Sequence, residues 1–325
     1  MIPAVDLFSG AGGFSAGAEL AGARVLLAAN HNPDAVRWHQ RNHPATEHAC
    51  QDLQQFDFSQ LPDISRGLLL AAPACQGHSQ NAQPARKGTG GSHAPDLGRA
   101  AERAHLQRST AWAVVTAAEV ARPRGLIVEN VPDFLRWRLF PAWGGALVAL
   151  GYTVRTHVLN AARYGSAQDR QRLIVTADRD GRGLGLSPTW GADSRALGDC
   201  LDLEPSPEHR WAKGGIAAKS ERMRWRMRKA QKEAGSLCVW NNVSESRGRA
   251  MHERAPTLTT KSGSQLYLLD GDDCRILNPR ELARIQGLPD TFQLPKQRAL
   301  CSLLIGNMIP VELSRGVTAQ VLGQL

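Results

Sequence analysis

The segment Ala4-Val5-Asp6-Leu7-Phe8-Ser9-Gly10-Ala11-Gly12-Gly13 decides the fold of this chain. Its first half predicts a strand, and its glycine-rich second half predicts a turn. Residues 14–21 follow with a helical pattern that ends at Gly22. Glycines between a strand and a helix let the backbone approach a ligand, and a helix N-terminus favours negative charge, so this unit is a candidate ligand site. A turn that needs glycine only for packing is the competing interpretation.

The turn is a poor match to a nicotinamide-dinucleotide site. Such a site contains Gly-x-Gly-x-x-Gly and an acidic residue at the end of the next strand. Here Ser15 occupies the third glycine position, and the next strand is expected to end at Asn30-His31. A nucleoside-type ligand such as S-adenosylmethionine is compatible with these residues.

Strands and helices continue to alternate after this unit. Alternation of this kind predicts an α/β domain with a doubly wound, mostly parallel sheet and right-handed crossovers. We expect this domain to span residues 1–177. Further strands are predicted at 24–29, 67–71, 126–128, 153–159 and 172–176, and helices at 33–42, 99–121 and 143–150.

The alternation fades after residue 177. Residues 178–260 are rich in Gly, Pro, Trp and charge, which predicts a second, smaller and irregular domain. Residues 261–325 are expected to return to the first domain, with helices at 278–285 and 311–322. The long polar loop at 76–98 predicts a lid or a binding loop, because structureless loops of that length are usually functional.

Composition restricts the class of protein. A hydrophobic content of 42% with 21% charged residues indicates a globular chain. No apolar stretch reaches 18 residues and no secretory signal pattern is present, so no membrane association is expected. The six cysteines are scattered without Cys-x-x-Cys, which argues against a metal site or a disulfide framework and for a reducing cytosol. A net charge of +9 favours a polyanionic partner.

Cys75 is a candidate nucleophile. It follows the predicted strand at 67–71, so its thiol is expected at the rim where open α/β sheets bind ligands. A lone cysteine is more often a buried structural residue. Glu129-Asn130-Val131, however, follows another predicted strand, and a nucleophile and an acid in one crevice make a reaction centre. Alone, Glu129 would more often be a helix-cap or surface residue.

Gln168-Asp169-Arg170-Gln171-Arg172 leads into the strand predicted at 172–176. Two arginines at i and i+2 of an extended segment point to the same side. There they could grip a phosphate or a base edge, or form surface ion pairs, which is the commoner role.

Six short motifs follow one another along the chain. They are Asp6-Leu7-Phe8-Ser9-Gly10-Ala11-Gly12-Gly13-Phe14, Pro73-Ala74-Cys75-Gln76, Glu129-Asn130-Val131, Gln168-Asp169-Arg170-Gln171-Arg172, Arg254-Ala255-Pro256-Thr257-Leu258-Thr259-Thr260 and Gly306-Asn307-Met308-Ile309-Pro310-Val311. Each motif is weakly specific, but the ordered set is strongly specific, and nearly end to end it resembles the DNA (cytosine-5) methyltransferase family. The resemblance implies a Rossmann-like S-adenosylmethionine-dependent methyltransferase fold with a smaller target-recognition domain.

The resemblance also implies catalytic roles. Cys75 would add to carbon 6 of a flipped-out cytosine, which makes carbon 5 nucleophilic. Glu129 would hold the ring N3 and the exocyclic amine, and Arg172 would bind the O2 side. Arg170 and Gln168 would support the site and the lid. Asn130 would fix the backbone around Glu129.

The implied cofactor is S-adenosyl-L-methionine, and this chain departs from the family near it. His31 stands where an acid usually binds the ribose, which predicts weaker or altered cofactor binding. Ala74 stands where proline usually precedes the nucleophile, and His78 where phenylalanine is common. The residues implied to bind the cofactor are Phe8, Gly10, Ala11, Gly12, His31, Asp52, Leu53, Pro73 and Asn307.

The segment 219–232 holds seven basic residues against one acid. Its alternating arginines fit a strand, but Met223, Met227 and Ala230 fit one face of a helix. We expect a DNA-binding helix, because Gly235 follows as a possible C-cap. A charged helix is usually only solvated, but its charge density and its place in the recognition region favour phosphate contacts. The residues expected to contact DNA are Arg222, Arg224, Arg226, Arg228 and Lys229, together with Arg86 and Lys87 of the loop.

Three alternatives stay open. An RNA cytosine-5 methyltransferase acting on a transfer RNA is one, although the basic region favours duplex DNA. A catalytically impaired DNA-binding homologue is another, favoured by His31 and Ala74 and opposed by the presence of Cys75, Glu129 and Arg172. Transfer of a modified group from an altered sulfonium donor is the third. An amino-group methyltransferase is disfavoured, because no Asp-Pro-Pro-Tyr or Asn-Pro-Pro-Tyr motif occurs.

We therefore expect a monomeric DNA methyltransferase with double-stranded DNA as its partner. Its expected location is cytoplasmic, associated with the nucleoid through DNA. Whether a cognate restriction endonuclease exists stays open.

Overall fold

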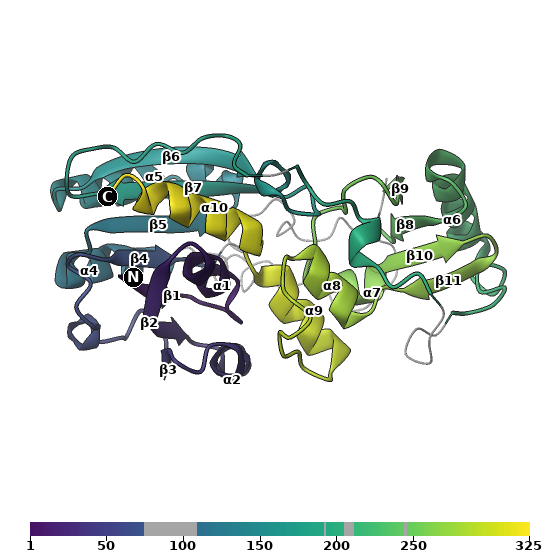
Figure 1. Ribbon diagram of the computed structural model, residues 1–325, viewed down its shortest axis with the longest axis horizontal. Helices are drawn as coiled ribbons and strands as arrows, with labels where there is room; N and C mark the ends of the chain where they lie inside the picture. The colour runs from purple at the N-terminus through teal and green to yellow at the C-terminus, as the bar shows by residue number, and fades with distance from the viewer. Residues whose placement is uncertain (75–108, 192, 205–210, 244–245) are drawn as a thin grey trace, which may run out of the picture.

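Two sheets organise the molecule (Figure 1). A seven-stranded sheet forms the large lobe, a four-stranded sheet forms the small lobe, and short helices lie between them. This computed structural model describes residues 1–74, 109–191, 193–204, 211–243 and 246–325.

The large sheet is mostly parallel, as the sequence predicts. Its strand order is β3-β2-β1-β4-β5-β7-β6. Strand β7 runs antiparallel to both β5 and β6, and the remaining adjacent pairs are parallel. The strands are β1 (Ile2–Leu7), β2 (Ala23–Asn30), β3 (Glu47–Cys50), β4 (Leu68–Ala71), β5 (Gly125–Asn130), β6 (Thr153–Asn160) and β7 (Gln171–Asp178).

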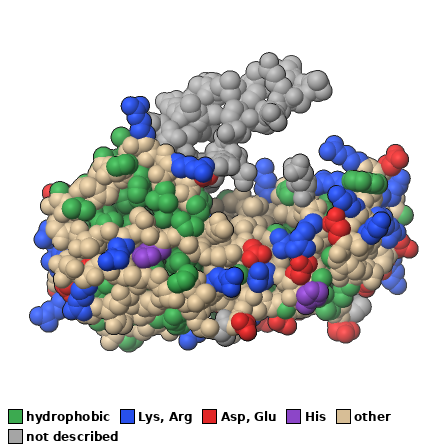
Figure 2. Space-filling model, turned by 90° about the horizontal axis from the view of Figure 1, so that it is seen from above, with side chains coloured by type: hydrophobic (Ala, Val, Ile, Leu, Met, Phe, Trp, Pro, Cys, Tyr) green, Lys and Arg blue, Asp and Glu red, His purple; other side chains and the backbone are tan. Residues whose placement is uncertain are grey.

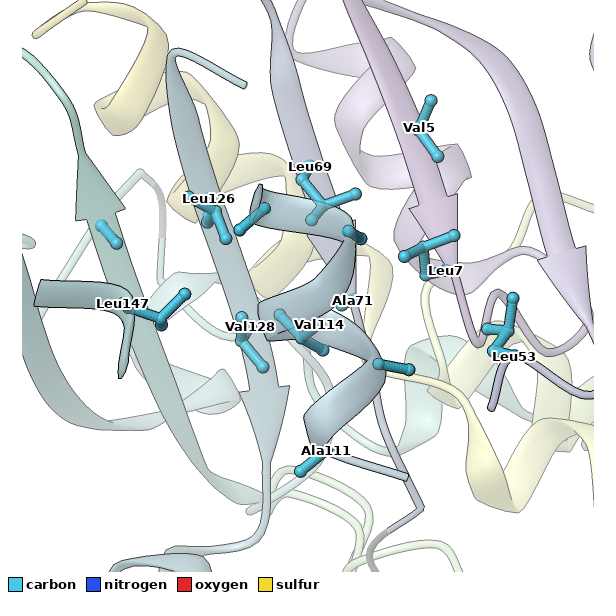
Figure 3. Packing of buried hydrophobic residues seen from close by; sticks show 14 of the residues in the cluster. Val5, Leu7, Leu53, Leu69, Ala71, Ala111, Val114, Leu126, Val128 and Leu147 are labelled. Atoms are coloured by element: carbon cyan, nitrogen blue, oxygen red, sulfur yellow. The ribbon is translucent and has the colours of Figure 1, made fainter. Parts of the chain in front are cut away.

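Helices cover both faces of this sheet because its central strands are apolar on both sides. Leu68 and Leu70 of β4 pack with α1 and α10, whereas Leu69 packs on the opposite face with α4 and α5. Figure 3 shows α4 lying across β4 and β5, with Val114 beside Val128. The helices of this lobe are α1 (Gly13–Leu20), α2 (Pro33–Asn42), α4 (Trp112–Ala121), α5 (Phe140–Ala149) and α10 (Val311–Leu322), with the short turns η1 (Phe58–Gln60), η3 (Pro132–Arg136) and η4 (Ala161–Tyr164).

Several boundaries differ from the sequence-based expectation, and two of them bear on the candidate site. The helix predicted at 99–121 is described only from Ser109 onward, and there the chain turns at Thr110 and Ala111 before α4 begins. Residues 99–108 lie outside the described part of the chain. Strand β5 continues through Glu129 and Asn130, because both residues pair with β7.

The small lobe is an antiparallel sheet covered by one helix. Its order is β11-β10-β8-β9, and the amphipathic helix α6 packs on it through Met227 and Ala230. A helix is therefore confirmed within 219–232, and Gly235 follows it at a φ of 96°. The elements are α6 (Glu221–Ala234), β8 (Cys238–Asn241), β9 (Gly248–Ala250), β10 (Leu266–Asp270) and β11 (Asp273–Ile276).

Strands β10 and β11 fall within the stretch 261–325, which the sequence assigns to the large domain. Because β10 pairs with β8, we propose that the small domain extends to about residue 276 instead of ending at 260. Its boundary with the large domain stays a prediction.

Another apolar cluster joins the lobes. Leu282 and Ile285 of one helix pack with Leu304 and Ile305 of the next, and a capping box between Asn278 and Glu281 starts the first of them. The elements here are η5 (Gly198–Cys200), α7 (Ser262–Gln265), α8 (Pro279–Ile285) and α9 (Arg298–Asn307). No helix in the described ranges is long and apolar enough to cross a bilayer.

Close packing of α1 on α10 makes Gly17 hard to replace. A Cβ at this position would lie 2.4 Å from Ser314 Cβ and 2.6 Å from the Arg315 amide nitrogen, so the helices would have to separate. Gly17→Ala should lower the free energy of unfolding by about 1–3 kcal/mol in urea denaturation. The matched variant Gly144→Ala lies inside α5, where no described atom is within 4 Å of the added Cβ. It should raise stability by about 0.5–1 kcal/mol. Equal effects of the two substitutions would contradict tight α1–α10 packing.

Candidate active site at the carboxyl edge of the sheet

Glu129 and Arg172 form an ion pair at the carboxyl edge of the large sheet. Glu129 lies near the end of β5, and Arg172 lies at the start of the reversed strand β7, so strand direction brings them together. Arg172 Nε is 2.6 Å from Glu129 Oε1, and each side chain is 11% exposed. A carboxylate and a guanidinium with little water around them can bind a polar heterocycle edge.

Asn130 connects this pair to the segment that leads into Cys75. Its Nδ2 donates to the Pro73 carbonyl at 3.0 Å, and its Oδ1 accepts from the Val131 amide at 2.8 Å. Cys75 follows two residues after Pro73 in sequence. Cys75, Arg86 and Lys87 lie outside the described residues, so their predicted roles stay predictions.

Gln168 and Arg170 are buried, and their partners differ from that of Arg172. Arg170 donates to the carbonyls of Leu258 at 2.5 Å and Gly306 at 2.9 Å. Gln168 Nε2 donates to Gln286 Oε1 at 2.7 Å, and its Oε1 accepts from the Leu258 amide. These bonds tie the start of β7 to the helices between the lobes.

The glycine-rich turn has the backbone geometry that a close-lying ligand requires. Phe8, Gly10 and Gly12 have φ values of 61°, 55° and 104°, and the Ser9 amide donates to the Ala29 carbonyl. Apart from its chain neighbours, no described residue lies within 4 Å of a Cβ built at Gly10. The turn therefore leaves room for a ligand beside Gly10.

The other predicted cofactor residues follow the strands beside this turn. His31 follows β2, Asp52 and Leu53 follow β3, and Pro73 follows β4, so the sheet order brings them to one edge. Leu53 and Pro73 are buried, whereas His31, Asp52 and Asn307 are exposed. The Gln51 amide donates to the Asn30 carbonyl, and this bond holds the loop after β3 beside the loop after β2. These residues fit a nucleoside cofactor, because they combine exposed polar groups with buried apolar side chains.

A buried polar chain lies directly beneath the turn, and the sequence did not reveal it. Ser15 Oγ donates to Asp6 Oδ2 at 2.7 Å and lies 3.0 Å from His39 Nε2. His39 Nδ1 lies 2.8 Å from His48 Nε2. Burial raises the pKa of Asp6 to about 7 and lowers the pKa of His39 well below its ordinary value. Burial therefore favours the neutral form of both groups. The only sequence signal is polar residues at inward-facing positions.

The basic helix α6 uses several of its predicted DNA-binding residues internally. Arg224 donates to the carbonyls of Ala217 and Lys219, and Arg228 pairs with Asp272. Arg226 lies over the Trp240 ring, with Cζ 5.0 Å from the centroid. These guanidinium groups hold the small lobe together, which sequence reasoning missed.

The outer surface of α6 still carries free cationic charge. Within the described ranges, Arg222 has no ion pair or side-chain hydrogen bond, and Lys229 makes only a loose pair with Glu233 at 3.8 Å. Trp225 is 64% exposed, and Lys229 Nζ lies 5.7 Å from its ring centroid. Figure 2 shows Lys and Arg side chains spread over the small lobe. Trp225 is therefore a further candidate for contact with DNA, and an aromatic residue within a basic run was its signal in the sequence.

Solved structures described as methyltransferases share this fold. The structure matches that of Spodoptera frugiperda DNMT2 with a TM-score of 0.67 and 14% identity, covering 100% of this chain and 99% of that one. It matches a proposed DNA modification methyltransferase from an E. coli prophage with a TM-score of 0.72 and 18% identity, covering 99% of both chains. At these identities the likeness concerns the fold.

Sequence comparison identifies the family. A sequence model described as C-5 cytosine-specific DNA methylase matches residues 2–323, so the chain belongs to that family. It is 27% identical over 334 residues to the Type II methyltransferase M.NlaX of Neisseria lactamica, covering 99% of this chain and 96% of the relative. It is 26% identical over 344 residues to M1.HphI of Haemophilus parahaemolyticus, covering 98% and 86%.

The buried carboxyl group of Asp6 should impose a pH dependence on stability. Its pKa is about 7 in the folded protein and 3.8 in the unfolded chain, so unfolding releases a proton between these values. Stability is therefore lost as pH rises from about 4 to 7, by at most about 1.4 kcal/mol per pH unit. Asp6→Asn removes this loss, so its stability relative to the wild type should rise over that range in urea denaturation.

A matched control is Asp57→Asn at an exposed turn. Hydrogen bonds from Ser59 lower the pKa of Asp57, so it titrates below this range and its variant should show no such trend. A flat difference between Asp6→Asn and the wild type would contradict the burial of a neutral Asp6.

Proposed function

We propose that this protein methylates carbon 5 of a flipped-out cytosine in a specific duplex DNA sequence, with S-adenosyl-L-methionine as donor. The observation that carries the proposal is the Glu129–Arg172 pair, linked through Asn130 to the segment that leads into Cys75. Membership of the C-5 cytosine-specific family supports the choice of base and atom.

The chemistry requires a nucleophile because cytosine carbon 5 is too electron-poor to attack a methyl donor. The Cys75 thiolate forms a bond to carbon 6, and the ring electron pair moves to carbon 5. Bound S-adenosyl-L-methionine supplies an electrophilic methyl group. After methylation, loss of the carbon 5 proton returns an electron pair to the ring, and the carbon–sulfur bond breaks to release Cys75. A stacked base cannot reach these groups, so the cytosine must leave the helix.

Glu129 and Arg172 would orient the extruded base. Glu129 would hold N3 and the exocyclic amine, and Arg172 would hold the O2 side. The 2.6 Å contact between Arg172 Nε and Glu129 Oε1 fixes the direction of the carboxyl group before the base arrives. Arg170 and Gln168 would act indirectly, by holding the start of β7 in place.

The turn and the loops beside it would hold the cofactor. The glycines of the turn would lie against its amino acid part, and His31 would hydrogen-bond the ribose hydroxyls in place of an acid. Asp52, Leu53, Pro73 and Asn307 would complete the pocket. We propose a monomer that acts on DNA, with a companion restriction endonuclease in keeping with its Type II relatives.

Covalent capture tests the proposed reaction directly. Wild-type protein with S-adenosyl-L-methionine and duplex DNA containing 5-fluorocytosine should form a denaturant-resistant complex, because the fluorine cannot leave as a proton does. Cys75→Ser should abolish that complex, and Glu129→Gln should slow its formation by about 10²- to 10⁴-fold. Bisulfite sequencing of DNA from expressing cells then reports the base and its sequence context.

The controls are Cys50→Ser and Glu119→Gln, which alter an exposed thiol and an exposed carboxylate and should leave capture unchanged. Capture on RNA but not DNA would favour the RNA alternative. DNA binding without capture would favour an impaired homologue. A product base heavier than 5-methylcytosine in mass spectrometry would favour an altered donor.

Helix α6 should contribute to DNA affinity through its free cations. Arg222→Gln should weaken binding and reduce the slope of log K against log salt by about 0.9, the value for one phosphate contact. Arg66→Gln is the matched control, because Arg66 is exposed at the amino end of β4, opposite the candidate site. Equal salt slopes for Arg222→Gln and the wild type would remove α6 from the interface. Arg224, Arg226 and Arg228 are unsuitable for this test because their loss would also disturb the small lobe.

A further inference from the structure

A single peptide group precedes Cys75 and is held at both of its polar atoms. It is the peptide between Pro73 and Ala74. Its carbonyl oxygen accepts from Asn130 Nδ2 at 3.0 Å, and its N–H donates to Thr110 Oγ1 at 3.2 Å. The two partners come from different elements, because Asn130 ends β5 and Thr110 precedes α4. The plane of this peptide is therefore fixed from opposite sides.

The second hydrogen bond exists only because residue 74 is not proline. Proline has no N–H, and its ring restricts the backbone directly. Alanine leaves φ free and exposes a donor that needs a partner. In this chain Thr110 provides that partner, so a side-chain hydrogen bond takes over the restraint that a proline ring would give.

Thr110 belongs to a turn that is itself well held. The next residue, Ala111, is 1% exposed, and its carbonyl accepts from Trp143 Nε1 at 2.9 Å. Ser109, on the other side, accepts from Gln54 Nε2 at 2.5 Å. The residues on both sides of Thr110 are therefore held by hydrogen bonds, which fixes the position of its hydroxyl.

We propose that Thr110 is a positioning residue for the methyl-transfer reaction: through Ala74 it sets the direction in which the chain leaves β4 toward Cys75. This inference rests on the proposed function, in which Cys75 is the nucleophile. Its loss should lower the rate of covalent bond formation even when the cofactor is saturating.

The first test compares Thr110→Val with Thr110→Ser. Valine keeps the shape and removes the hydroxyl, so kcat and the rate of capture on 5-fluorocytosine DNA should fall about 3- to 10-fold, the usual worth of one hydrogen bond. Serine keeps the hydroxyl and should recover most of the rate. The rates are compared at saturating S-adenosyl-L-methionine, so that a change in cofactor affinity does not enter, and the thermal midpoint should change little. Thr116→Val, on the exposed side of α4, is the matched control and should behave as the wild type.

The second test asks whether a proline makes Thr110 dispensable. Ala74→Pro alone should lower the rate, because the proline Cδ would occupy the space into which the N–H points and would meet the Thr110 hydroxyl. Thr110→Ala alone should also lower the rate. The double variant, Ala74→Pro with Thr110→Ala, should be faster than either, because it removes the collision and restrains the backbone by the ring.

The outcomes separate this inference from the proposed function. If the wild type captures DNA and Thr110→Val captures it equally fast, the positioning role is wrong while the proposed function stands. The same holds if Thr110→Ser is as slow as Thr110→Val. It also holds if the free-energy effects of Ala74→Pro and Thr110→Ala on the rate simply add in the double variant. If the wild type captures no DNA and methylates none, the proposed function itself fails.

Discussion

The reversal of strand β7 is the constraint on which the candidate site depends. In a parallel sheet only carboxyl ends of strands meet at the ligand-binding edge. Because β7 runs the other way, its first residues reach that edge, and Arg172 can pair with Glu129 at the end of β5. A parallel β7 would place this arginine at the far end of the sheet. The reversed strand therefore brings a cation to the edge where β5 ends with Glu129 and where β4 leads into the segment before Cys75.

The same reversed strand also anchors the second half of the molecule. Gln168 and Arg170, just before β7, are bonded to Leu258, Gln286 and Gly306, which belong to segments around the helices between the lobes. Arg170 is almost fully buried, and a buried guanidinium is tolerated only when carbonyls or carboxylates compensate its lost hydration. The helices between the lobes are thus tied to the backbone that presents Arg172.

The sequence predicted the architecture well where a pattern was long or chemically distinctive. The alternation of residues 4–177 predicted the parallel sheet, and the spacing of Met223, Met227 and Ala230 predicted helix α6. Pairing across long sequence distances left no such pattern, so the joining of β10 to β8 was not foreseen.

The candidate site shows the same limit. Glu129 and Arg172 could be selected because they lie in recognisable motifs. The hydrogen bond of Thr110 and the buried chain from Asp6 to His48 could not, because each joins residues from separate elements whose spacing carries no period. The internal use of Arg224 and Arg228 was hidden for a related reason: a count of charges does not show which of them already have partners.

The contact between α1 and α10 has a consequence for how the protein is made. Ser314 Oγ donates to the Phe14 carbonyl at 2.8 Å, so the first turn of α1 is bonded to a helix that is translated 300 residues later. On the ribosome, α1 therefore has part of its apolar surface uncovered until α10 is made. Contacts this distant in sequence form slowly, so the packing of α1 on α10 is expected to be a late step in folding.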